Sequence, residues 1–268
     1  FEVIVTRMTD DCDPIELSRF LLHVATEGAV TELRSEVYDS EPGVCIGRRP
    51  VGLARTRSHA GTTKAGSHFA RIATLEAAAV VAFERLGNEL QRLGAPPSLV
   101  ADAHRAARDE VRHAEVMAAV ARHFGAEPEP PSVDPGPARD AYGIAVENAV
   151  EGCVRETFGA LSGCYQSLAA KHPMVAEAMR DVAEDEIVHA ELSSRVDAFL
   201  DSLLTERQRQ SVSRARRQAI AELRLEMTVA PDAQVASLTG LPSPELALEW
   251  IDLMERDVWP AREARFDA

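Results

Sequence analysis

The motif Asp-Glu-x-x-His-Ala-Glu occurs twice, and it constrains the fold more than any other feature of the chain. The first copy, DEVRHAEV, covers residues 109–116, and the second, DEIVHAEL, covers residues 185–192. In each copy a Glu and the His three residues later lie on one face of a helix. The neighbouring apolar residues recur at the same spacing, which predicts that this face is buried. The two motifs therefore place ionisable side chains inside a helical protein.

The composition favours a helical, soluble protein. Hydrophobic residues make up 46% of the 268 residues, charged residues 27% and aromatic residues only 5%, and the abundant Ala, Leu, Glu and Arg have high helix propensity. The formal net charge of −14 argues against a nucleic-acid partner. No run of 18 apolar residues occurs, so we expect no membrane span and take the cytoplasm as the default compartment. The sequence begins at Phe1 rather than Met, which leaves an upstream targeting segment open.

Helix start and stop signals divide most of the chain into long helices. Ser98, Thr205 and Ser243 are expected N-caps, and Gly94 and Gly125 are expected terminators. The expected helices that follow one another between these signals cover about 67–92, 98–124, 138–170, 173–204 and 205–228, with a sixth after Ser243.

The connections predict how these helices pack. The first and third connections are short, whereas the proline-rich stretch AEPEPPSVDPGP between the second and third helices is a long crossover. This layout is typical of a four-helix bundle with one long connection. We expect an N-terminal extension over 1–66, partly irregular, with a strand at FEVIV and a helix within Asp13–Val37. The bundle would cover 67–204, and a helical extension would cover 205–268.

Carboxylates also interrupt the apolar faces of the other two bundle helices. Glu76 precedes Glu110 by 34 residues and Glu151 precedes Glu186 by 35, each about the path of one helix, a turn and a return to the same level. Burying ionised carboxylates costs several kcal/mol per ion unless something compensates the charge. Two divalent or trivalent cations would do so, and carboxylates with imidazoles suit iron or manganese better than zinc. The pattern predicts a dimetal centre.

These residues resemble the ferritin-like diiron carboxylate proteins, which include bacterioferritin, rubrerythrin, the ribonucleotide reductase small subunit and the bacterial multicomponent monooxygenases. The resemblance covers residues 67–204 and implies an all-α, ferritin-like four-helix bundle. It implies two Fe ions, or alternatively Mn or a mixed Mn/Fe pair, held by Glu76, Glu110, His113, Glu151, Glu186 and His189. It also implies that Asp109 orients His189 and that Asp185 orients His113.

Some assignments stay open on the sequence alone. Glu147 lies one turn before Glu151 and is an extra ligand, an acid behind the ligands or the partner of an arginine, whereas Glu151 has a rival role as an i,i+4 partner of Arg155. Glu156 falls outside the inward face of its helix and is expected at the surface, and His68 is expected at the surface or at a helix end.

The cysteines do not form a zinc pattern. Cys153 and Cys164 lie roughly 16 Å apart along one expected helix, too far for a disulfide, and the pairing of Cys12 with Cys45 stays open.

The leading expectation is an oxidoreductase that activates O2 or peroxide and oxidises a small organic substrate, with an unknown electron donor and a possible homodimer. The extensions outside 67–204 would suit a substrate channel or lid better than a storage cage. The alternatives are a ferroxidase or other iron-handling protein, a peroxide-detoxifying rubrerythrin- or manganese-catalase-like protein, and a metal-free helical bundle. No CxxC pair is present, which argues against a rubredoxin module.

Overall fold

The computed structural model describes residues 2–11, 15–25, 30–41, 48–54, 63–134 and 136–259. The chain divides into two compact units, Phe1–Cys45 and Ile46–Ala268. Among the helices of the described residues, none combines the length and the apolar character needed to cross a membrane.

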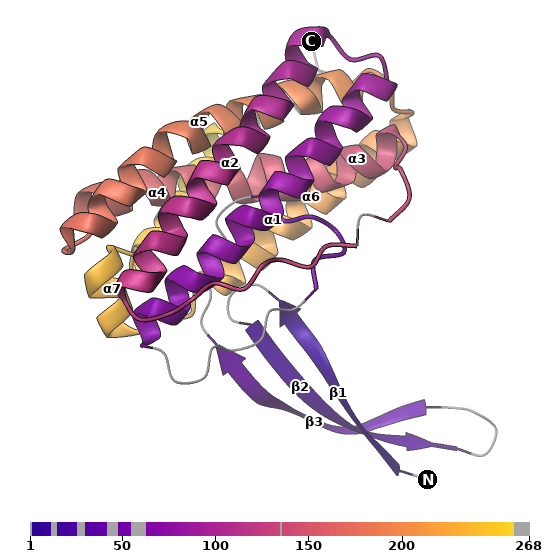
Figure 1. The fold of residues 1–268 in the computed structure, drawn as a ribbon. Helices are drawn as coiled ribbons and strands as arrows, with labels where there is room; N and C mark the ends of the chain where they lie inside the picture. Colours follow the sequence, from indigo (N-terminus) through magenta and orange to yellow (C-terminus); the bar gives the residue numbers. More distant parts are fainter. Residues whose placement is uncertain are drawn as a thin grey trace. The chain divides into compact units, whose positions relative to one another are not determined.

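The first unit contains a three-stranded antiparallel sheet. Its strands are β1 (Glu2–Asp11), β2 (Ile15–Val24) and β3 (Val30–Glu41), in the order β1-β2-β3 (Figure 1). Phe20 of β2 pairs with Val5 of β1 and with Ser35 of β3. The expected N-terminal strand is confirmed, but the expected helix within Asp13–Val37 is wrong. Leu, Glu and Arg in this range favour helix locally, and pairing with distant strands overrides that preference.

The second unit is helical over most of its described length. The expected long helices are confirmed to within a few residues, and the short α7 was not expected. Gly94 and Gly125 end their helices with φ of +74° and +83°, whereas Pro96 and not Ser98 caps the second helix. The helices are α1 (Lys64–Arg92), α2 (Pro97–His123), α3 (Ala141–Glu147), η1 (Asn148–Glu156), α4 (Thr157–Ala169), α5 (Pro173–Asp201), α6 (Glu206–Glu226), α7 (Ala233–Thr239) and α8 (Pro244–Asp257).

The segments α3, η1 and α4 form one continuous helix whose middle is a π-helix. In a π-helix the backbone bonds join residues five apart, so each turn is wider than in an α-helix. Side chains show the same spacing, since Asn148 Nδ2 lies 3.6 Å from Cys153 Sγ. A 3.6-residue pattern therefore loses register across η1. As a result Glu156, expected at the surface, is fully buried.

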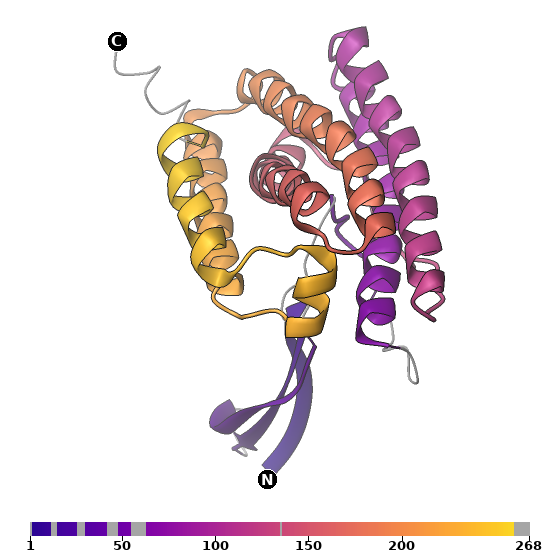
Figure 2. The same ribbon diagram turned by 90° about the vertical axis from the view of Figure 1, so that its left-hand side faces the viewer.

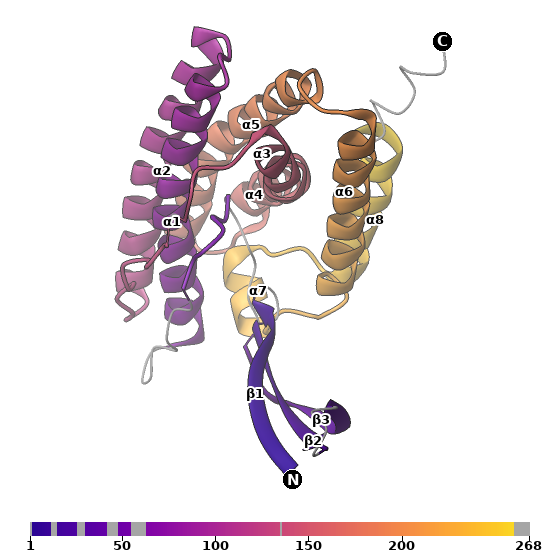
Figure 3. The same ribbon diagram turned by 90° about the vertical axis from the view of Figure 1, so that its right-hand side faces the viewer.

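The α3–η1–α4 helix lies at the centre of the second unit. Figures 2 and 3 look nearly along its axis and show α1 and α2 on one side and α6 and α8 on the other. Helix α1 packs on α2, and α2 packs on α5. Helix α5 also packs on α4 and η1. One apolar cluster contains Phe83, Leu86, Ile144 and Val196, and another joins η1 and α4 to α6 and α8 through Val154 and its neighbours.

Candidate metal centre

Five ionisable side chains from three helices meet in the interior of the second unit. Each is at most 2% exposed. Four of them could hold a metal ion, because their ligand atoms lie within 4.8 Å of one another; these are Glu76, Glu110, His113 and Glu186. The five residues, all of them predicted from the sequence, are Glu76 from α1, Glu110 and His113 from α2, and Glu186 and His189 from α5.

Two of the carboxylates lie between the two imidazoles. Glu110 Oε2 is 3.4 Å from His113 Nδ1, and Glu110 Oε1 is 3.3 Å from His189 Nδ1. Glu186 Oε1 is 3.4 Å from both of these nitrogens. Glu76 approaches only one side of the group, with Oε2 3.9 Å from His113 Nδ1. The centre therefore has two halves, one around each imidazole, which share Glu110 and Glu186.

The aspartate of each motif contacts the histidine of the other motif. His113 Nε2 lies 3.1 Å from Asp185 Oδ2, and His189 Nε2 lies 3.5 Å from Asp109 Oδ2. Arg112 binds both aspartates at 2.7 Å. Because an ionised carboxylate only accepts hydrogen bonds, each Nε2 carries a proton, and a ring that has lost its other proton presents the lone pair of Nδ1 to the centre. This is the cross-helix pairing expected from the doubled motif.

The atoms that face the centre lack hydrogen-bond partners. Among the described residues, no partner is found for either carboxylate oxygen of Glu76, Glu110 or Glu186, or for Nδ1 of His113 or His189. Polar atoms buried in this way are normally satisfied, and each one left alone costs free energy. A cation among them would satisfy all of them at once. The donor set of carboxylate oxygens and imidazole nitrogens fits iron or manganese.

The pKa values reflect this concentration of charge. Burial and the neighbouring Glu110 raise the pKa of Glu76 well above its usual range. Burial also opposes ionisation of Glu110, but the two imidazoles outweigh it and lower the pKa to about 2. Burial disfavours the imidazolium form, yet the surrounding carboxylates raise the pKa of His113 to about 12 and of His189 to about 11. Protons thus neutralise the cluster when no metal is bound, and metal ions would have to displace them.

The central helix contributes Glu156 to this region, where the sequence predicted Glu151. Glu156 has no exposed surface, its Oε2 accepts a hydrogen bond from Ser193 Oγ at 2.7 Å, and its Oε1 has no partner among the described residues. Burial, together with the charge of Glu186, raises its pKa to about 7 against the opposing effect of Arg48. The expectation of a surface position was wrong because the wide turn of η1 rotates Glu156 inward.

The structure does not bring Glu151 or Glu147 to the group. Glu151 Oε2 is 3.4 Å from the backbone N of Arg49, and the charges that act most on the pKa of Glu151 are Arg155, Arg49 and Glu147 rather than the histidines. Glu147 forms an ion pair with Arg139. The arginine-partner alternative for Glu147 is therefore the one that the structure contains. No 3.6-residue reading could have selected Glu156, because its register depends on the π-helix.

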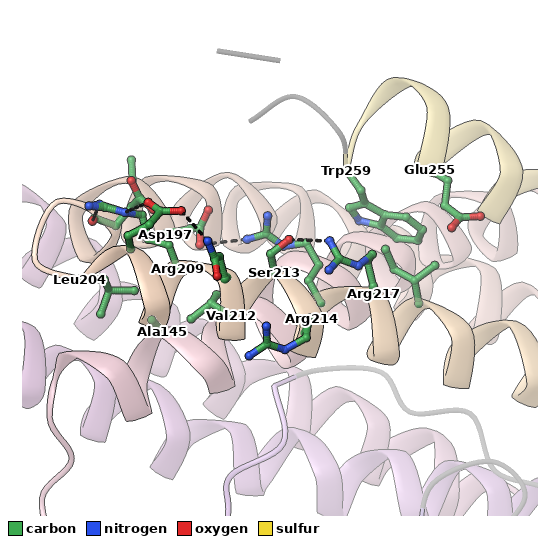
Figure 4. Close-up of a pocket in the computed structure, with 16 residues that line it drawn as sticks. Ala145, Asp197, Leu204, Arg209, Val212, Ser213, Arg214, Arg217, Glu255 and Trp259 are labelled. Atoms are coloured by element: carbon green, nitrogen blue, oxygen red, sulfur yellow. Dashed lines mark hydrogen bonds and ion pairs between the residues drawn. The ribbon is translucent and has the colours of Figure 1, made fainter. Parts of the chain in front are cut away.

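A separate cavity of about 910 Å³ opens between α5 and α6 (Figure 4). Four arginines and four acidic residues line it together with Trp259, and none of the cluster carboxylates does. Arg216 pairs with Asp197 across this cavity at 2.9 Å. Because positive and negative side chains line the cavity in equal number, the lining favours neither an anionic nor a cationic ligand.

The cysteines and His68 are not among the five residues of the cluster, and expectations were made for both. Cys153 and Cys164 are free thiols, as their separation predicted, whereas Cys12 and Cys45 lie outside the described residues. His68 lies near the N-terminal end of α1, one of the two places expected for it, and it is buried rather than at the surface. Burial and the nearby Arg71 lower its pKa to about 3.

Comparison with known proteins adds no relative from which a role could be transferred. The function of the centre must therefore be inferred from its own side chains. No protein family, curated protein or solved structure matches this chain.

Proposed function

We propose that this chain is a ferritin-like dimetal carboxylate oxidoreductase. It would hold two Fe ions, or Mn in their place, and use O2 or peroxide to oxidise a small organic substrate. One observation carries the proposal: the carboxylate oxygens and imidazole nitrogens that meet between α1, α2 and α5 are buried without partners among the described residues. The doubled motif and its resemblance to the diiron carboxylate proteins add the number and the kind of ion.

Six residues would hold the ions, with Glu156 taking the place predicted for Glu151. Glu76 and His113 belong to one half of the centre, Glu156 and His189 to the other, and Glu110 and Glu186 lie between the halves. Four carboxylates then balance the charge of two divalent cations, which is what makes their burial tolerable.

When bound, a pair of iron or manganese ions supplies redox equivalents and Lewis acidity. The residues of the chain prepare the site for this chemistry. Asp185 and Asp109 fix the protonated nitrogen of each imidazole, so that Nδ1 stays available. Phe83, whose ring centroid is 5.1 Å from that of His189, gives the centre an apolar wall.

Metal analysis tests the proposal first. Protein reconstituted with Fe(II) under anaerobic conditions should contain about two ions per chain. Glu110→Ala and Glu186→Ala should each lose metal while far-UV circular dichroism stays unchanged. Glu115→Ala and Glu191→Ala are matched controls, because these exposed glutamates belong to the same two helices. Less than about 0.2 metal per chain in the unaltered protein would refute a resident metal.

Reaction of the loaded protein separates the kinds of chemistry. O2 consumption in excess of the bound iron, with a reductant supplied, is expected for an oxidase or oxygenase. Stoichiometric oxidation of added Fe(II) followed by accumulation of many ferric ions would favour iron handling instead. Disproportionation of hydrogen peroxide without an organic product would favour detoxification. Either of the last two outcomes would overturn the oxygenase proposal.

A further inference from the structure

A fully buried arginine lies beside the candidate metal centre, and the proposed function does not use it. Arg48 has no exposed surface, and it is one of the charges that act on Glu156. Its guanidinium lies 5.3 Å from the centroid of the Phe83 ring, the same ring that faces His189. Arg48 thus contacts the same Phe83 ring that lies against His189, and it also contacts η1 through Asn148.

The surroundings hold this guanidinium in one place. Arg48 Nη2 donates to Asn148 Oδ1 at 2.6 Å, and Asn148 is itself fixed by donating to the carbonyl of Ser193 at 2.9 Å. Gly152 leaves the space, because a Cβ there would lie 2.8 Å from Arg48 Nη2. The π-helix therefore supplies both a polar partner and a gap for the side chain, while Phe83 offers the face of its ring to the cation.

Two nitrogens of Arg48 have nothing to donate to. Nε and Nη1 are buried, and no hydrogen-bond partner for either exists among the described residues. Arginine stays charged in proteins and carries donors on all three of its nitrogens. Leaving such donors buried without an acceptor costs free energy, as does the buried charge itself. An anion that reached these nitrogens would remove both costs.

The charges of the metal-loaded centre point the same way. The carboxylates of Glu76, Glu110, Glu156 and Glu186 balance two divalent cations, and the histidines are neutral as ligands. The neighbours that hold Arg48 in place, Asn148 and Phe83, carry no charge. Asp109 and Asp185 are partly exposed and are bound by Arg112 on the outer side of the imidazoles. Two aspartates and one arginine leave a single negative charge there, on the far side of the imidazoles from the metal ions. With Glu156 engaged by the metal ions, none of the anions described so far lies free beside Arg48.

From this we propose that Arg48 binds the carboxylate group of a small monoanionic ligand next to the metal ions. The substrate of the proposed oxidoreductase would accordingly be a carboxylic acid, anchored through its carboxylate. This inference rests on the proposed function, since Glu156 stays available as an anion for Arg48 unless the metal ions engage it. A carboxylate matches both the single charge and the need for acceptor oxygens, whereas a doubly charged phosphate would overcompensate.

Calorimetric titration with formate and benzoate tests this, with formamide and benzamide as neutral analogues. The iron-loaded protein should bind at least one of the two carboxylates and neither amide. Arg48→Gln should weaken that binding by about 10- to 100-fold, the value of a charge-assisted hydrogen bond. Arg48→Lys should restore part of it, because the charge is kept. Arg49→Gln, the same change one residue further along the chain, should leave it unaltered.

The metal content of the same samples distinguishes a failure of the role of Arg48 from a failure of the proposed function. If all variants hold about two irons but bind the carboxylates as the unaltered protein does, the anion sits on the metals and the role of Arg48 is refuted, while the proposed function stands. Absence of carboxylate binding in the iron-loaded, unaltered protein also refutes it. If the unaltered protein holds no metal, the proposed function fails, and this inference fails with it.

A structure of the unaltered protein removes the dependence on variant folding. Crystals of the iron-loaded protein soaked with 4-bromobenzoate should show bromine anomalous density with the carboxylate facing Arg48 Nε or Nη1. Density only at other positions, or none at a concentration that saturates the calorimetric signal, would overturn the assignment.

Discussion

Replacement of Glu156 by Gln should stabilise the metal-free protein and weaken the metal centre at the same time. Burial and the charge of Glu186 raise the pKa of Glu156 from an ordinary 4.5 to about 7. A carboxyl whose pKa is higher in the folded protein than in the unfolded chain loses stability as pH rises through these values. With about 1.4 kcal/mol per pKa unit, ionised Glu156 costs about 3 kcal/mol at pH 8. At pH 5 the cost falls below about 1 kcal/mol, because the folded form keeps its proton.

Gln has nearly the same shape, can still accept the hydrogen bond from Ser193 and carries no charge. Urea unfolding of chelator-treated protein at pH 5 and pH 8 measures the gain. Elemental analysis after iron loading measures the loss, which should leave no more than about one ion per chain.

Glu151→Gln is the matched control for this experiment. Burial also raises the pKa of Glu151, so the metal-free variant should likewise gain stability at high pH. It should nevertheless keep both ions, because Glu151 faces Arg49 and Arg155 instead of the histidines. If Glu156→Gln keeps two ions and Glu151→Gln loses one, the register assigned to η1 is wrong. A Glu156→Gln protein with no gain at pH 8 would contradict the electrostatic reasoning itself.

Three further changes probe the surroundings of the centre. Asp185→Asn should lower metal affinity about 10- to 100-fold in competition with a chelator, because the imidazole it orients loses its anchor; unchanged affinity would contradict that role. Gly152→Ala should destabilise the protein by about 1–3 kcal/mol in urea unfolding, since the added Cβ would lie 2.5 Å from Ser193 Oγ. His68 has a pKa of about 3 in the folded protein and about 6.5 in the unfolded chain, so below pH 6.5 only the unfolded chain takes up a proton at this residue. Stability should therefore fall by up to about 1.4 kcal/mol per pH unit from this group, and His68→Gln should lack that part of the acid sensitivity.

Regular α-helices made part of the candidate centre predictable. Glu76, Glu110 and Glu186 lie on helices that keep the 3.6-residue period, so their apolar neighbours indicated the buried face correctly. The histidines three residues after Glu110 and Glu186 followed from the same geometry. The N-terminal sheet was missed beyond its first strand, because strand pairing depends on residues that are distant in the sequence.

The sequence by itself determined that carboxylates and histidines from α1, α2 and α5 would share one interior, because helical periodicity is a local property. Only the tertiary structure decided that Glu156, and neither Glu147 nor Glu151, turns toward them. A π-helix shifts every later side chain around the helix axis, and the 3.6-residue pattern contains no sign of that shift. The position of Arg48 was likewise decided by tertiary structure, because Asn148 and Gly152, which receive it, are about 100 residues away in the chain.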